Sequence, residues 1–204
     1  MSQSAAESLV ACLLEMAEAK TNPVLQVIPE SLVIEENKKY PTKLLQFSGL
    51  GWRAYYHCHP ASRAGHHRFQ GEHGHFHIFV RTRENPEQWS HLVALAMDNM
   101  GQPLGWFTVN HWVTGESWKS ASILSSYLDS VPFEKTESLL ECWLLSLLAL
   151  SADAVRFVLN KRDNVLATKQ EQTREKDIKQ DKDIYLLSEE AFNLKELINL
   201  NYSK

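Results

Sequence analysis

The sequence predicts an α+β fold: an antiparallel β-sheet of four or more strands with a histidine-rich face, an N-terminal helix and a long C-terminal helix. Three observations lead to this prediction. Apolar residues recur at helical spacing near the N-terminus and again after residue 136. Between residues 52 and 109 the apolar period changes to two, which is typical of strands. Asn, Gly and Pro cluster between two of these segments, as they do in hairpin turns.

The first helix is expected to begin after Ser4 and to end near Lys20. Ser4 and Glu7 have the spacing of a capping box, and apolar residues then repeat on one helical face (Ala6, Leu9, Val10, Leu13 and Ala17). The segment lacks a basic leader and acids interrupt its apolar positions, so we interpret it as a helix and not as a signal peptide. Residues 24–50 are mixed, and Pro29 and Pro41 break any long element.

Strands are expected at residues 52–59 and 73–80, where the period of the pattern is two, and next along the chain at residues 92–97 and 104–109. Residues 98–103 contain Asn, Gly and Pro and form the turn between the last two strands. Neighbouring strands that are joined by short turns run antiparallel.

Helical periodicity returns after Gly115. A short helix is expected at residues 117–129, and residues 136–160 give the strongest helical pattern of the chain. Residues 161–183 are dense in charges of both signs and form either a helix extension or a linker. Residues 184–187 are expected to be extended, and Ser188 to cap a small helix. We expect one domain over residues 1–204.

The composition excludes several classes of protein. Lys and Arg number 21 and Asp and Glu number 25, so the net charge of −4 argues against a general nucleic-acid binder. Three widely spaced cysteines without a CxxC pair indicate neither a disulfide framework nor a thiolate zinc site, and a reducing cytoplasm is the natural compartment. The longest apolar stretch, residues 142–150, is too short to span a membrane.

All nine histidines fall between residues 57 and 111. His57 and His59 are expected on one face of the first strand, together with Tyr55, and His73, His75 and His77 on one face of the second. If the two strands pair with His59 opposite His73, then His57 lies opposite His75 and Tyr55 opposite His77. Opposed side chains are close enough for imidazoles to share one ion, whereas a slip of one residue would separate them.

The sequence therefore predicts a transition-metal site with five candidate ligands: His57, His59, His73, His75 and His77. Glu72 is the nearest carboxylate and is expected to be a ligand or a general base. Zinc, iron and copper all accept imidazole ligands, so the histidines do not determine which of these metals is bound. Without a metal, the same imidazoles can act as acid, base or nucleophile. His66 and His67, beside Arg63 and Arg68, are expected to be solvated, and His91 and His111 to be structural.

Residues His73-Gly-His75-Phe-His77-Ile-Phe79 resemble the histidine triad motif. The resemblance implies hydrolysis or transfer of nucleotides, with His75 as the nucleophile, His73 and His77 as supports, and Arg63, Arg68 and Arg81 on phosphate oxygens. It covers seven residues of 204, departs from the motif at Gly74, and lies more than a hundred residues before the end of the chain.

Four ordered motifs also resemble a bacterial family that is catalogued only as a domain of unknown function. They are Tyr55-Tyr-His-Cys-His-Pro60, Gly71-Glu-His-Gly-His-Phe-His77, His91-Leu-Val-Ala-Leu95 and Val109-Asn-His-Trp-Val-Thr-Gly-Glu116. The likeness runs through most of the chain and includes Leu186-Leu-Ser-Glu. It implies a single domain and places the site in the same region, but it implies no reaction.

Three functional hypotheses follow. The first is a metalloprotein, in its fuller form a metalloenzyme that acts on a small-molecule substrate, with Glu72 and His75 in its catalytic machinery. The second is a phosphate-handling enzyme with His75 as nucleophile. The third is a non-catalytic metal-binding or interaction module.

Overall fold

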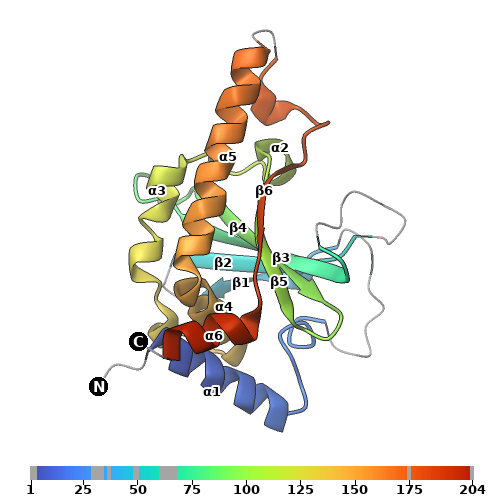
Figure 1. The fold of residues 1–204 in the computed structure, drawn as a ribbon, viewed down its shortest axis with the longest axis vertical. Helices are drawn as coiled ribbons and strands as arrows, with labels where there is room; N and C mark the ends of the chain where they lie inside the picture. Colours follow the sequence, from blue (N-terminus) through green and yellow to red (C-terminus); the bar gives the residue numbers. More distant parts are fainter. Residues whose placement is uncertain are drawn as a thin grey trace.

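The computed structural model describes residues 4–28, 35, 38–47, 51–59, 69–173 and 176–202. Six strands form one sheet: β1 (Tyr40–Phe47), β2 (Trp52–His57), β3 (Glu72–Arg81), β4 (Trp89–Asp98), β5 (Pro103–Val109) and β6 (Leu186–Ala191). Their order in the sheet is their order in the chain, and every neighbouring pair is antiparallel. The predicted α+β fold with an antiparallel sheet is confirmed (Figure 1).

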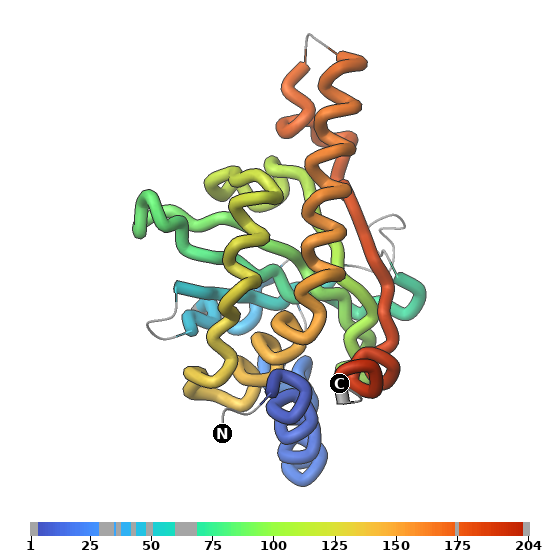
Figure 2. Tube along the Cα trace, turned by 60° about the vertical axis from the view of Figure 1, so that its left-hand side comes forward, coloured from blue at the N-terminus to red at the C-terminus, as the bar shows by residue number. Residues whose placement is uncertain are grey.

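Four longer helices accompany the sheet: α1 (Ala5–Glu18), α4 (Leu139–Leu150), α5 (Ala152–Gln172) and α6 (Leu194–Tyr202). Two short helices, α2 (His111–Thr114) and α3 (Ala121–Ser125), and the 3-10 turns η1 (Leu128–Ser130), η2 (Phe133–Lys135) and η3 (Ile178–Gln180) complete the connections. Figure 2 shows α5 rising well beyond the sheet while β6 runs back beside it, and the two elements are in contact.

The two faces of the sheet are packed differently. Phe76 and Ile78 of β3 point to the side that α1, α4 and α5 cover, where they join Trp143 and Leu144 in the main hydrophobic core. All four of these side chains are fully buried. The opposite face holds a smaller cluster of Ala94, Ala96, Phe107 and Val109. Small side chains on that second face leave room for the larger polar side chains of the neighbouring strand.

The N-terminal helix begins as its sequence predicts. Ser4 accepts a hydrogen bond from the backbone N–H of Glu7, and the Glu7 carboxylate accepts one from the backbone N–H of Ser4 at 2.8 Å. This reciprocal pair satisfies two amide groups that have no partner inside the helix.

The predicted helix over residues 136–160 is two helices, α4 and α5, which meet at a bend of 71°. Ser151 leaves the helical conformation at the bend (φ −103°, ψ 21°), and its hydroxyl donates to the carbonyl of Leu147 at 2.6 Å. A serine that bonds back to the preceding turn favours a bend, but apolar periodicity continues through it and hides the break. Helix α5 then continues to Gln172, so the charged stretch is helical up to that residue.

Three further predictions need correction. The short helix expected at residues 117–129 is limited to α3 and the 3-10 turn η1. Residues 24–50, which predict no clear element, contain β1. Ser188 does not cap a helix: it lies in β6, where its hydroxyl is bonded to Thr108 and to the carbonyl of Val158. These tertiary partners, from β5 and α5, override the local capping preference.

Among the helices that the structure describes, none alone is long and apolar enough to cross a bilayer. Helices α4 and α5 reach that length and composition only when they are taken together across their bend.

Candidate metal centre

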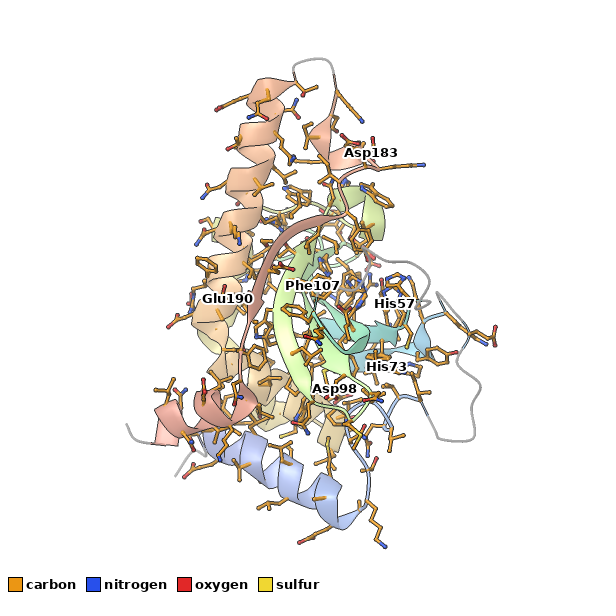
Figure 3. All side chains as sticks on the ribbon, turned by 45° about the vertical axis from the view of Figure 1, so that its right-hand side comes forward. His57, His73, Asp98, Phe107, Asp183 and Glu190 are labelled. Atoms are coloured by element: carbon orange, nitrogen blue, oxygen red, sulfur yellow. The ribbon has the colours of Figure 1, made fainter. Side chains whose placement is uncertain are left out.

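Strands β2 and β3 pair in the register that the histidine pattern predicts. His57 lies opposite His75, and Tyr55 lies opposite His77. On the other side of β3, His75 and His77 lie opposite Ala96 and Ala94 of β4. His57, His75 and His77 therefore share the face that the long helices leave uncovered, and Figure 3 shows His57 on the side of the sheet away from α5.

Three histidines converge on this face: His57 at the end of β2, His59 two residues later, and His75 in β3. One ring nitrogen of each lies within 4.8 Å of the other two, an arrangement that can hold a metal ion. His57 Nε2 and His75 Nε2 are 2.6 Å apart, and the ring centroids of His57 and His59 are separated by 4.7 Å. Zinc–imidazole bonds of about 2.0–2.1 Å place ligand nitrogens about 3.3 Å apart, so an ion requires only a small opening of the cluster.

A β-bulge at the start of β3 places a carboxylate behind this cluster. Glu72 lies opposite Asp98 and Gly74 lies opposite Met97, so two steps along β3 match one step along β4. In a regular strand Glu72 and His75 would point to opposite faces, because they are three residues apart. The extra residue of the bulge reverses Glu72, whose Oε1 accepts a hydrogen bond from His75 Nδ1 at 2.9 Å.

This hydrogen bond fixes the proton on His75. The Nδ1–H group donates to the carboxylate, so Nε2 carries the lone pair that faces His57. Both partners are buried, with exposed fractions of 6% for Glu72 and 0% for His75. Two imidazole lone pairs repel each other at 2.6 Å, so a proton or a cation is needed between them.

His73 lies apart from the three converging histidines. Its Nδ1 is hydrogen-bonded to Tyr56 Oη at 2.8 Å and is 3.9 Å from the Cys58 sulfur. Tyr56 and Cys58 both belong to the main hydrophobic core on the helix-covered side. The prediction that His73 shares a face with His75 and His77 is therefore wrong, because the bulge interrupts the alternation between them.

His77 lies beside the three histidines without belonging to their group. Its ring centroid is 5.0 Å from that of His57 and 4.9 Å from that of His75. Its Nδ1 is hydrogen-bonded to His91 Nε2 at 2.9 Å. Burial and the positive charge of Arg162 lower the pKa of His91 to about 3, which keeps that ring neutral.

Sequence reasoning does not find this role of His91. Two steps along β4, from Val93 to His91, match one step along β3, from Ile78 to Phe79, and this second irregularity places His91 opposite Phe79. The sequence shows no signal for it. His111 is bonded to the carbonyl of Glu116 at 2.7 Å and to Gln180 at 2.9 Å.

Aromatic side chains surround the three histidines. The ring centroid of Phe107 is 5.0 Å from that of His75, and the centroid of Tyr185 is 6.3 Å from that of His59. Tyr185 is held in place because its carbonyl accepts from the backbone N–H of Asn110 at 2.8 Å. Burial raises the pKa of Tyr55, which also contacts His57. Apolar walls of this kind strengthen the electrostatic interactions between the groups they enclose.

Arg81, a candidate phosphate ligand, is exposed and its guanidinium stacks on Trp89 at 5.1 Å. His66, His67, Arg63 and Arg68 fall outside the described residues.

Comparison with curated proteins and with solved structures gives no match. The resemblance to the histidine triad motif is thus not shown. A family model described as a domain of unknown function (DUF6969) matches residues 3–192, a range that includes the three converging histidines and Glu72. The match covers nearly the whole chain, and the protein belongs to this family.

Proposed function

We propose that the protein binds one divalent transition-metal ion through His57, His59 and His75, and that it is a metalloenzyme whose ion keeps a position open for water or a small-molecule substrate. The observation that carries the proposal is the convergence of three imidazole nitrogens within 4.8 Å of one another on the aromatic-lined face of the sheet.

The hydrogen bond from His75 to Glu72 supports a metal site over a chance cluster of histidines. Histidines that bind metals in proteins almost always donate their other ring N–H to a carboxylate, a carbonyl or water, which fixes the tautomer and the ring orientation. Here the buried Glu72 carboxylate holds Nδ1–H and directs Nε2 toward His57. The carboxylate also supplies a negative charge near three neutral ligands, which favours a divalent cation.

The ligand set indicates the chemistry. Three neutral imidazoles with a free fourth position are one of the ligand sets of catalytic zinc, and a bound zinc ion lowers the pKa of its water to about 7. Iron and copper also accept imidazole ligands. In this assignment Glu72 is a positioning residue and His75 is a ligand. The Nε2 atom that a nucleophilic His75 would need is then committed to the metal.

A closed, non-catalytic site is the second candidate, and the position of His77 favours it. The His77 ring lies 4.9 Å from that of His75, so a modest rotation brings it toward the same ion as a fourth ligand. Against this, His77 is not among the residues whose ring nitrogens lie within 4.8 Å of one another, and the rotation would have to displace its Nδ1 hydrogen bond to His91 at 2.9 Å. Four protein ligands would complete a tetrahedral shell and leave no position for a substrate.

Metal stoichiometry tests the proposal directly. Protein stripped with a chelator is titrated with Zn²⁺ and Co²⁺, and bound metal is measured by elemental analysis and by competition with a chromophoric chelator. We expect one ion per chain, with affinity reduced more than 100-fold in His57→Ala and in His75→Ala. The matched control is His73→Ala, which removes a neighbouring histidine that lies outside the group.

Loss of binding in the control equal to that in His75→Ala, or the absence of stoichiometric metal in wild-type protein, would contradict the proposal. The Co²⁺ form separates the two candidates, because its visible spectrum reports the coordination shell. An open site predicts a spectral change on addition of azide and a nearly unchanged affinity in His77→Ala. A closed site predicts no change with azide and a large loss of affinity in His77→Ala.

A further inference from the structure

A pocket of about 580 Å³ lies between α1, α4 and the segment that precedes α4. It belongs to the helix-covered side of the sheet, because Cys12 at its wall is part of the main hydrophobic core. Both Cys12 and Cys142 line this pocket, together with Glu15 and Thr136. The metal centre lies on the other face of the sheet, so the two sites are separate.

The two thiols form an unequal pair. Cys12 is buried, with 4% exposed, and the neighbouring Cys142 raises its pKa. Cys142 is partly exposed, and its sulfur shares a hydrogen bond of 3.9 Å with the Ser146 hydroxyl. It also lies in the first turns of α4, where the helix dipole favours an anion.

The local environment selects Cys142 as the reactive sulfur. The neighbouring Cys12, with Ser146 and Thr136, lowers the pKa of Cys142 against the opposing effects of burial and the Glu15 carboxylate. The proximity of Cys142, together with burial, raises the pKa of Cys12. Cys58, the remaining cysteine, is buried against Tyr56, and burial raises its pKa to about 11. A thiolate attacks disulfides and a thiol does not, so reactivity is confined to the Cys12–Cys142 pair.

We propose that Cys12 and Cys142 form a redox-active dithiol that a low-molecular-weight disulfide oxidises to a bond between α1 and α4. The Cys142 thiolate attacks one sulfur of the small disulfide, forms a mixed disulfide and releases one small thiolate, which takes up a proton from water. Cys12 then loses its proton and attacks the Cys142 sulfur. The second small thiolate leaves and is protonated, so two protein thiols are oxidised and one small disulfide is reduced to two thiols.

Closure of this bond joins Cys12 to Cys142 and so links α1 to α4, two helices that are far apart in the sequence and packed together in the fold. A crosslink over a long loop restricts the unfolded chain more than the folded one. For a chain of this size we expect the unfolding midpoint Tm to rise by about 5–10 °C on oxidation and to return on reduction.

The experiment uses the full chain incubated with glutathione disulfide at neutral pH. Peptide mapping without reduction should recover the peptides of Cys12 and Cys142 joined to each other, with the loss of two hydrogens from the intact mass. The Cys58→Ala variant should form the same bond. The Cys142→Ser variant should form none, and Cys58 should remain unmodified in it.

Three results would overturn the proposal: a stable mixed disulfide on Cys142 without a crosslink, oxidation that involves Cys58, or no modification at all. A second measurement does not depend on the fold of any variant. Iodoacetamide should alkylate Cys142 of the wild-type protein at least about 10-fold faster than Cys58, because alkylation follows the thiolate fraction. Equal rates would also overturn the proposal.

Discussion

Gly74 is a residue of β3 at which β2 passes close by, beside the metal centre. A Cβ atom at this position would lie 2.6 Å from the backbone oxygen of His57 and 2.6 Å from Tyr56 Oη. Ordinary carbon–oxygen contacts are about 3.3 Å or longer, so Gly74→Ala must displace these groups by roughly 0.7 Å. The His57 oxygen is a backbone atom of β2, and it moves only if the strand moves.

Two opposing effects set the loss of stability. Overpacking in a dense region costs about 1–3 kcal/mol. The lower conformational entropy of the unfolded alanine chain returns about 0.4–1 kcal/mol, because the φ angle of Gly74 lies outside the left-handed region. We therefore expect the free energy of unfolding to fall by about 1–2 kcal/mol.

The effect on metal binding should be larger, because Gly74 is adjacent to His75 and its clash is with His57. Metal–ligand distances tolerate deviations of about 0.2 Å, well below the displacement required. We expect the affinity for Zn²⁺ to fall at least about 10-fold, measured by chelator competition, together with the stability measured by urea unfolding.

Gly71→Ala is the matched control. Gly71 has a φ of +81° and nothing within 4 Å of its missing Cβ, so alanine there costs backbone strain of about 1 kcal/mol and pushes on no ligand. Wild-type metal affinity in Gly74→Ala, or an equal loss of affinity in Gly71→Ala, would refute the reasoning.

Three further predictions follow from the contacts of single residues. Glu72→Gln should weaken Zn²⁺ binding about 10–100-fold in the same competition assay, and an unchanged affinity would show that the carboxylate does not orient His75. Arg162→Met should lower the free energy of urea unfolding by about 2–4 kcal/mol, because the buried guanidinium side chain, 3% exposed, is bonded to the partly exposed Asp163. A loss below about 0.5 kcal/mol, the size expected of surface changes, would contradict this contribution. The pKa of His91 is about 3 in the folded chain against 6.5 unfolded, so the unfolded chain binds more protons between these values. Stability should therefore decrease as the pH falls from 6.5 toward 3, by up to about 1.4 kcal/mol per unit, and His91→Gln should flatten that dependence.

The sequence predicts the pairing of β2 with β3 because one physical rule governs it. A slip of one residue would put the two sets of histidines on opposite faces, and the register assumed from the histidine pattern, with His57 opposite His75, is the one that the structure has. The start of α1 is equally local, since Ser4 and Glu7 lie within one turn of each other. Interactions between residues that are close in the sequence, such as this capping box, can be recognised from the order of the residue types.

The predicted ligand set is less accurate because a bulge leaves no clear mark in the alternation. Residues 72–77 read as a regular strand, yet the irregularity at Glu72–Gly74 moves His73 to the core side and turns Glu72 toward His75. Gly74 was a visible departure from bulky hydrophobic residues, and a glycine within a strand often marks a bulge or a close approach of another backbone. Tyr185 could not be assigned to the site, because its position depends on the pairing of β6 with β5, far along the chain.

The bulge also determines which changes in chain length the metal centre can tolerate. The entropy of closing a connection between two strands grows slowly, by about 0.6 kcal/mol for each doubling of its length, so residues added to the chain after His59 and before β3 change the stability little. A single residue inserted or deleted within Glu72–Gly74 has a different result, because it exchanges the faces to which the residues before the bulge point. Relatives of this protein can therefore differ in the length of that connection and keep the centre, whereas a one-residue change at the bulge separates the carboxylate from its histidine.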